Sequence, residues 1–76
     1  MITVEKAFEI ASENSLGIKL SPKPYDFGDS WCFDYGGEED ITGFLPIIIK
    51  KHDGSIIPFV FPDDEMRLLD APVATD

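Results

Sequence analysis

At 76 residues the chain has room for one domain with one small core, since a chain of this length buries only about 60% of the surface its unfolded form exposes. The formal net charge of −9, from 15 acidic and 6 basic residues, argues against direct nucleic-acid binding, which depends on many Lys and Arg side chains. The 43% of hydrophobic residues excludes a disordered chain. We therefore expect one globular domain over residues 1–76.

The cysteine count and the hydropathy pattern bear on the compartment. Cys32 is the only cysteine and cannot form a disulfide within the chain, so the sequence lacks the framework typical of small secreted domains. The first residues lack the basic segment and apolar run of a secretory signal, and no stretch approaches the roughly 18 apolar residues of a membrane span. These features predict a cytoplasmic protein that binds no membrane.

The N-terminal segment has the pattern of an amphipathic helix over about residues 3–14. Thr3 is a suitable N-cap, and Glu5 suits the positive end of the helix dipole. The apolar face has residues at positions i, i+3, i+4 and i+7, namely Val4, Ala7, Phe8 and Ala11. Stop signals follow over residues 14–17.

Two strand-like segments follow the helix. Residues 18–20 begin an alternating pattern, but the prolines at 22 and 24 lack the N–H of a central strand, which predicts a short or irregular edge strand. Turn-forming residues occupy 26–29, and residues 30–35 then alternate, with Trp31, Phe33 and Tyr35 on one face. We expect most of this aromatic face to pack under the N-terminal helix, and the glycine-rich segment 36–43 to be a mobile connection.

Residues 44–61 predict a β-hairpin around Asp53-Gly54. A two-residue turn would pair Ile57 with Lys50 and Phe59 with Ile48, over about five pairs. Because Pro58 cannot donate a hydrogen bond, its strand should lie at the sheet edge, with the 44–51 strand inside. Both faces of the hairpin are apolar, so the second face also needs a cover.

The C-terminal segment offers that cover. Asp63, Asp64 and Glu65 precede an apolar pair, Leu68 and Leu69, which predicts an acid-capped helix of one or two turns. Residues 70–76 read as a frayed tail. The sequence thus predicts an α+β fold in which an N-terminal helix packs on a three- to four-stranded antiparallel sheet with a central β-hairpin and a short C-terminal helical turn.

The residue types offer little support for catalysis. Cys32 and His52 are the only thiol and imidazole, so a Cys-His nucleophilic pair would need both. Asp34 is flanked by the large aromatic residues Phe33 and Tyr35, but strand alternation turns it to the opposite face. The acidic runs 38–40 and 63–65 lack the spacing of a calcium loop, and no zinc-ligand spacing or phosphate-binding glycine loop is present. We expect no enzymatic activity, no cofactor and no metal.

The chain resembles a known family in the order of its elements. The opening Ile2-Thr3-Val4-Glu5-Lys6-Ala7, the aromatic strand Ser30-Trp31-Cys32-Phe33 and the hairpin Pro46-Ile47-Ile48-Ile49-Lys50-Lys51-His52-Asp53-Gly54-Ser55-Ile56 resemble the small bacterial YrhB-like proteins grouped as immunity protein 35. The resemblance covers roughly residues 2–61 and implies a cytoplasmic protein that binds and neutralises a toxin, with no catalytic residues to carry over. After Phe61 the sequence departs from the family pattern, which leaves the C-terminal contacts open.

The acidic balance independently favours a basic partner, because an acidic surface steers basic proteins toward itself. The sequence therefore predicts a non-enzymatic protein that occludes a basic toxin or nuclease stoichiometrically. The predicted contact residues are the acids Glu38, Glu39, Asp40, Asp63, Asp64 and Glu65 and the aromatic anchors Trp31 and Tyr35. Two alternatives stay open: a self-associating module that pairs through the edge strand 56–61, and a small ligand-binding domain or hydrolase that uses Cys32, His52 or Asp34. The acidic surface also has a simpler interpretation, solubility.

Overall fold

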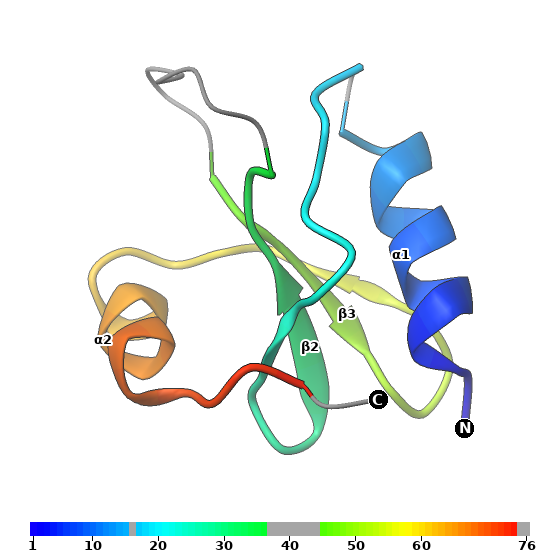
Figure 1. Cartoon of the computed structure of the whole chain (residues 1–76). Coiled ribbons are helices and arrows are strands. Elements are labelled where there is room, and N and C mark those ends of the chain that lie inside the picture. The colour runs from blue at the N-terminus through cyan, green and yellow to red at the C-terminus, as the bar shows by residue number, and fades with distance from the viewer. Residues whose placement is uncertain (16, 37–44, 75–76) are drawn as a thin grey trace.

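The fold is an antiparallel sheet with a helix on each side. The computed structural model describes residues 1–15, 17–36 and 45–74. Its elements are α1 (Val4–Glu13), β1 (Tyr25–Asp26), β2 (Ser30–Phe33), β3 (Ile47–Lys50), β4 (Ile56–Ile57) and α2 (Asp63–Asp70). The four strands form one sheet in the order β1-β2-β3-β4 (Figure 1). This architecture confirms the predicted α+β fold. Neither α1 nor α2 has the length and apolarity to cross a membrane.

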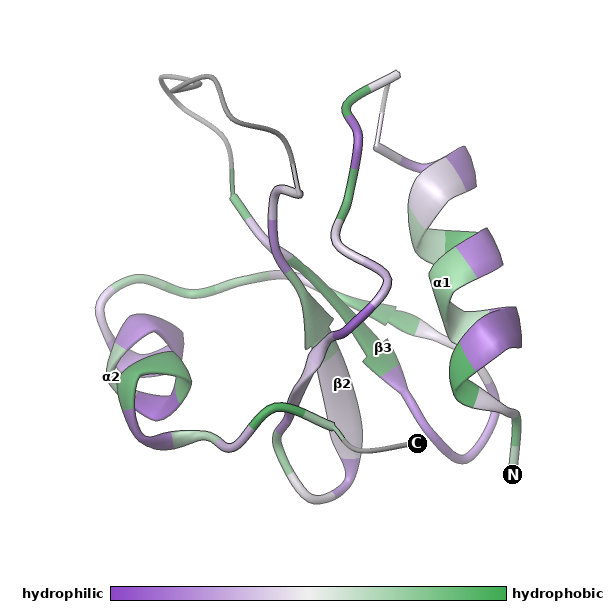
Figure 2. Ribbon diagram, in the orientation of Figure 1, coloured by the Kyte–Doolittle hydropathy of each residue, from purple (hydrophilic) through white to green (hydrophobic). Residues whose placement is uncertain are grey.

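The helix α1 begins and packs as its sequence predicts. The Thr3 hydroxyl accepts a hydrogen bond from the Lys6 main-chain N–H at 3.1 Å, and Asn14 caps the other end. The side of α1 that faces the sheet is hydrophobic and its outer side is hydrophilic (Figure 2). The buried core comprises Ala7, Ala11, Leu20, Trp31, Phe33 and Ile49. The aromatic face of β2 therefore lies under α1, as expected.

The β3–β4 hairpin has a register that differs from the predicted one. Ile48 pairs with Ile57 and Ile49 with Ile56, so the loop comprises the four residues 51–54 rather than the two-residue turn expected at Asp53-Gly54. Gly54 closes this loop with φ +80°, and the Asp53 carboxylate accepts the Ser55 N–H at 2.9 Å. A shift of two residues leaves each side chain on its predicted face.

The hairpin ladder is also shorter than predicted, with two pairs in place of about five. Pro58 follows β4 directly and has no N–H to continue the ladder. The position of β4 at the sheet edge and of β3 inside the sheet confirms the rest of the expectation.

The structure adds a strand that the sequence analysis did not identify. Tyr25 and Asp26 form β1, which pairs with β2 around a turn in which the Gly28 N–H donates to the Asp26 carboxylate at 2.7 Å. The chain end then pairs with β1: the Asp26 N–H donates to the Pro72 carbonyl and the Ala74 N–H to the Pro24 carbonyl, both at 2.8 Å. The predicted frayed tail is therefore wrong as far as Ala74, because main-chain hydrogen bonds fix this segment.

The second face of the sheet lies toward α2. Cys32 and Ile48, on the face opposite Trp31, are 0% and 2% exposed. The helix α2 lies on this side, where the Arg67 guanidinium donates to the Phe27 carbonyl at 3.1 Å (Figure 1). Of the two leucines proposed as cover, Leu68 is half-buried and Leu69 is 81% exposed, so Leu68 is the inward residue.

The predictions for residues 18–20 and for the connection 36–43 have different outcomes. Residues 18–20 form no strand and contribute a single bridge between Leu20 and Tyr35, which confirms the short, irregular expectation. Residues 37–44 lie outside the described residues, and with them most of the predicted connection 36–43 and the acids Glu38, Glu39 and Asp40.

Gly36→Ala should destabilise the fold, because an alanine Cβ would lie 2.6 Å from the Ser21 nitrogen and 2.8 Å from the Leu20 carbonyl carbon. We expect a loss of about 1–3 kcal/mol in the free energy of unfolding, as for other overpacked sites. Hydrogen exchange should also show lost protection of the Ser21 N–H, which donates to the Asp34 carbonyl. Gly17→Ala is the control for the close approach. At φ +86° its backbone also disfavours alanine, but no atom lies within 4 Å of the added Cβ. Unchanged protection of Ser21 in Gly36→Ala would contradict the close approach.

Candidate functional site

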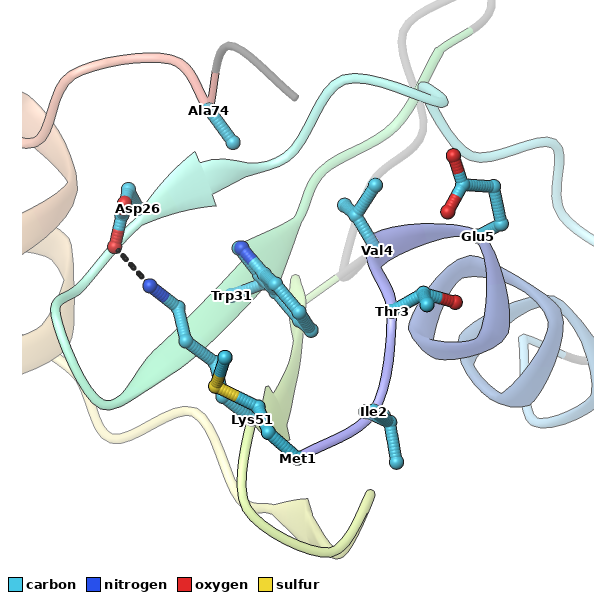
Figure 3. Close-up of a pocket in the computed structure, with 9 residues that line it drawn as sticks. All are labelled: Met1, Ile2, Thr3, Val4, Glu5, Asp26, Trp31, Lys51 and Ala74. Carbon is cyan, nitrogen blue, oxygen red and sulfur yellow. Dashed lines mark hydrogen bonds and ion pairs between the residues drawn. The ribbon is translucent and has the colours of Figure 1, made fainter.

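The structure contains a hollow of about 580 Å³ between the start of α1, β2 and the loop after β3 (Figure 3). Residues 1–5 line one side of it, and Asp26, Trp31, Lys51 and Ala74 line the rest. The Ile2 N–H donates to the Lys51 carbonyl at 2.8 Å, which fixes the segment before α1 against the end of β3. The hollow therefore forms where five segments of the chain meet: the start of α1, β1, β2, the loop after β3 and the segment around Ala74.

A partly buried ion pair occupies one wall of the hollow. The Lys51 ammonium lies 2.8 Å from the Asp26 carboxylate and 5.3 Å from the centre of a Trp31 ring. The Lys51 side chain is 18% exposed, so its charge is largely withdrawn from water and depends on Asp26 for compensation. The hydrogen bond from Lys51, and then that from the Gly28 N–H, hold the pKa of Asp26 below its usual value.

The outward face of α2 is the second candidate site. Met66 and Leu69 are three residues apart, so they share one side of the helix, and they are 64% and 81% exposed. The acids Glu65 and Asp70 flank this pair around the helix. Val60 and Phe61, just before α2, add exposed apolar surface. This face, defined here by residues 65, 66, 69 and 70, combines an apolar centre with an acidic border.

Polar contacts attach α2 to the sheet. The Arg67 guanidinium lies 4.4 Å from the centre of the Phe27 ring and donates to the Phe27 carbonyl at 3.1 Å. The Asp64 carboxylate accepts the Val60 N–H at 2.7 Å and lies 3.6 Å from Arg67. These contacts orient the helix so that Leu68 points inward and its outward face is free for contact.

The residues predicted to contact a partner differ in how exposed they are to solvent. Trp31 is 9% exposed and belongs to the core cluster that includes Ala7 and Ala11 of α1, so its role as an interface anchor stays a prediction. The Asp64 carboxylate accepts a hydrogen bond from the Val60 N–H within the chain. Asp63 and Glu65 are exposed in the first turn of α2. Tyr35 is half-buried where its backbone bridges Leu20.

The residues considered for catalysis do not form a site. Cys32 is 0% exposed, and burial, with a smaller effect from Asp34, raises the pKa of its thiol to about 12. A thiol with this pKa is protonated at neutral pH and is a poor nucleophile. His52 is exposed in the β3–β4 loop, and the Asp34 carboxylate accepts the Tyr35 N–H at 2.7 Å. Among residues 1–15, 17–36 and 45–74, no group of three or more His, Cys, Asp or Glu side chains could hold a metal.

The sequence analysis missed Lys51 and Asp26. The sequence predicts Lys51 only as the last residue of the 44–51 strand, and Asp26 only as a residue of the turn 26–29. The residues are far apart in sequence, and neither carries a motif, so no pattern indicates that they pair.

The comparisons leave the family open. The chain matches no family model, no curated protein and no solved structure significantly. The resemblance to the YrhB-like family therefore stays a prediction from the sequence.

Asp26→Asn should reduce stability in a pH-dependent way. Because the pKa of Asp26 is lowered on folding, the ion pair stabilises the protein above the unfolded-state pKa of about 3.9, and this contribution is lost as the pH falls through the folded pKa. We expect a loss of at most about 1 kcal/mol at pH 7, since solvent screens the partly exposed pair. The difference between the variant and the natural protein should vanish in acid.

Urea unfolding of both proteins across this pH range is the measurement. Asparagine keeps an oxygen for the Gly28 N–H, so the variant removes the charge pair alone. Asp70→Asn, at an exposed acid of α2, is the control. A difference between Asp26→Asn and the natural protein that stays constant into acid would contradict the role of the pair.

Proposed function

We propose that this protein is a non-enzymatic binding protein that occludes a basic protein partner, and that the outward face of α2 is its contact surface. The observation that carries the proposal is the pair Met66 and Leu69, which are 64% and 81% exposed between acidic neighbours. Large exposed apolar side chains with a polar border are typical of protein interfaces.

The charge of the chain supports a basic partner. The net charge of −9 steers basic proteins toward the molecule, and the exposed acids Glu65 and Asp70 flank the apolar pair on α2. A partner that presents Lys or Arg around an apolar patch would match both features. An acidic partner would be repelled at long range.

A toxin-neutralising immunity protein in the cytoplasm is the role that fits this binding mode. Such a protein needs no chemistry of its own, because it inhibits by covering the toxin surface. The resemblance of residues 2–61 to immunity protein 35 supports this role, and basic nucleases are toxins of the expected charge. Cys32, with a pKa of about 12, offers no competing nucleophile.

Self-association through the edge strand has less support. The strand β4 comprises only Ile56 and Ile57, and Pro58 follows it. Two residues provide few main-chain hydrogen bonds for pairing with a second copy.

Met66→Ser with Leu69→Ser should weaken partner binding strongly and leave the fold intact, because both side chains are exposed. Truncating an apolar interface centre typically costs about 2 kcal/mol or more, or about 30-fold in affinity. The tagged natural chain and the variant would be used to capture proteins from the native cells at low salt. Leu45→Ser, at a residue 55% exposed elsewhere, is the matched control.

Three outcomes of the capture experiment are informative. A basic protein held one-to-one by the natural chain and by Leu45→Ser, but lost from the double variant, supports the proposal. Equal capture by all three proteins overturns the assignment to α2. Recovery of the bait alone, as a dimer in size-exclusion chromatography, favours self-association instead.

Asp63→Lys with Glu65→Lys should slow association with the captured partner at low salt. Both acids are exposed, whereas Asp64 must stay because it binds the Val60 N–H. We expect about a tenfold lower association rate, and a difference that shrinks as salt screens the charges. The matched control reverses two exposed acids of α1, Glu9 and Glu13, with the same change in net charge. Equal rates for the two double variants would mean that only the net charge matters.

A further inference from the structure

The hollow beside α1 is bordered by a hydrogen-bond donor, the Trp31 indole N–H, for which the described residues provide no acceptor. Trp31 is 9% exposed, and no hydrogen bond in residues 1–15, 17–36 and 45–74 uses its indole N–H. In these residues no fully buried side-chain nitrogen lacks a partner, so the indole nitrogen must reach the surface of the hollow. In Figure 3 it points toward the space between the Asp26–Lys51 pair and Ala74. An unpaired donor on a buried side chain favours a bound acceptor.

Further donors border the same space. The Lys51 ammonium has three N–H groups and gives one of them to Asp26, at 2.8 Å. Val4 and Glu5 begin α1, so their main-chain N–H groups have no acceptor within the helix, and both residues line the hollow. The positive end of the helix dipole thus lies beside the indole and ammonium groups.

Part of the remaining wall is apolar, beside the polar Thr3. Ile2, Val4 and Ala74 line it and pack against the core. A volume of about 580 Å³ is within the range of small-molecule sites. A ligand would therefore combine one acceptor group with a short hydrocarbon body.

The charges around the hollow restrict the acceptor group. Lys51 would repel an ammonium ligand. The carboxylate next to Lys51, that of Asp26, could not compensate, because it already accepts hydrogen bonds from Lys51 and Gly28. Glu5 also borders the hollow, so a dianion such as phosphate would meet two carboxylates, which offset the two ammonium groups of Lys51 and Met1. A singly charged acceptor avoids this repulsion and still receives charge-assisted hydrogen bonds.

We propose that this hollow binds a monocarboxylate with a short aliphatic body, whose oxygens accept hydrogen bonds from the Trp31 indole and the Lys51 ammonium. The body of the ligand lies against Ile2, Val4 and Ala74. This site is separate from the outward face of α2, so the proposal does not depend on the proposed function. Either a small carboxylic acid or the C-terminal carboxylate of a peptide has the required chemistry.

The chain has one tryptophan, so its single indole N–H resonance reports directly on the site. Sodium butyrate is the first probe in a ¹⁵N–¹H NMR titration, with butylamine and inorganic phosphate as controls. We expect a saturable shift of the indole resonance with butyrate and none with the other two. A linear, unsaturated response to butyrate, or an equal response to butylamine, would overturn the proposal.

Lys51→Met tests the second donor, because it keeps the length of the side chain and removes the ammonium. We expect about tenfold weaker butyrate binding, the effect of losing one charge-assisted hydrogen bond. Lys50→Met is the matched control, since the neighbouring Lys50 is exposed and lies outside the hollow. Equal butyrate affinity in the two variants would remove Lys51 from the site. If Lys51→Met does not fold, Ala74→Leu, which fills the hollow, should block the titration instead.

A second pair of probes identifies the source of the carboxylate. The tripeptide Gly-Val-Val with a free C-terminus is compared with its C-terminal amide. Saturable binding of the free tripeptide alone assigns the site to peptide C-termini. Binding of butyrate but of neither peptide assigns it to small carboxylic acids, and binding of the amide as strongly as the free peptide contradicts carboxylate recognition.

Discussion

The close packing of α1 on β2 and β3 is the constraint on which the other features depend. Ala7 and Ala11 are 0% exposed, and such small side chains let the helix axis approach the aromatic face of the sheet. Phe8 and Phe33 then meet with ring centres 5.9 Å apart. The same approach brings the start of α1 beside Trp31, so the hollow and its donors are consequences of core packing.

The two helices are held by different forces. Burial holds α1, whereas no residue of α2 is fully buried, and Arg67 and Asp64 attach it through charge and hydrogen bonds. A helix held in this way needs few of its own apolar residues for stability. Met66 and Leu69 therefore stay exposed on its outward face.

Local patterns in the sequence suffice for much of the fold and for little of the hollow. The cap and apolar spacing of α1, the alternation of β2 and the proline after β4 each act over a few residues, and the structure confirms them. The hairpin register depends on whether Asp53-Gly54 is centred in the loop or closes it, and both positions suit an αL glycine. The strand β1 and the chain end are held by main-chain bonds between distant segments, which leave no trace in residue type.

The acidic composition has two distinct uses in this fold. Asp26 and Asp64 neutralise Lys51 and Arg67 at positions that fix the structure, so neither carboxylate is free for a partner. Asp63, Glu65 and Asp70 are exposed on α2, where their charge acts at long range. The net charge does not distinguish the paired acids from the exposed acids, because the difference between them lies in their tertiary contacts. The separation also means that surface acids of α2 can be reversed without disturbing the ion pair at the hollow, so the two candidate sites can be tested independently in one protein.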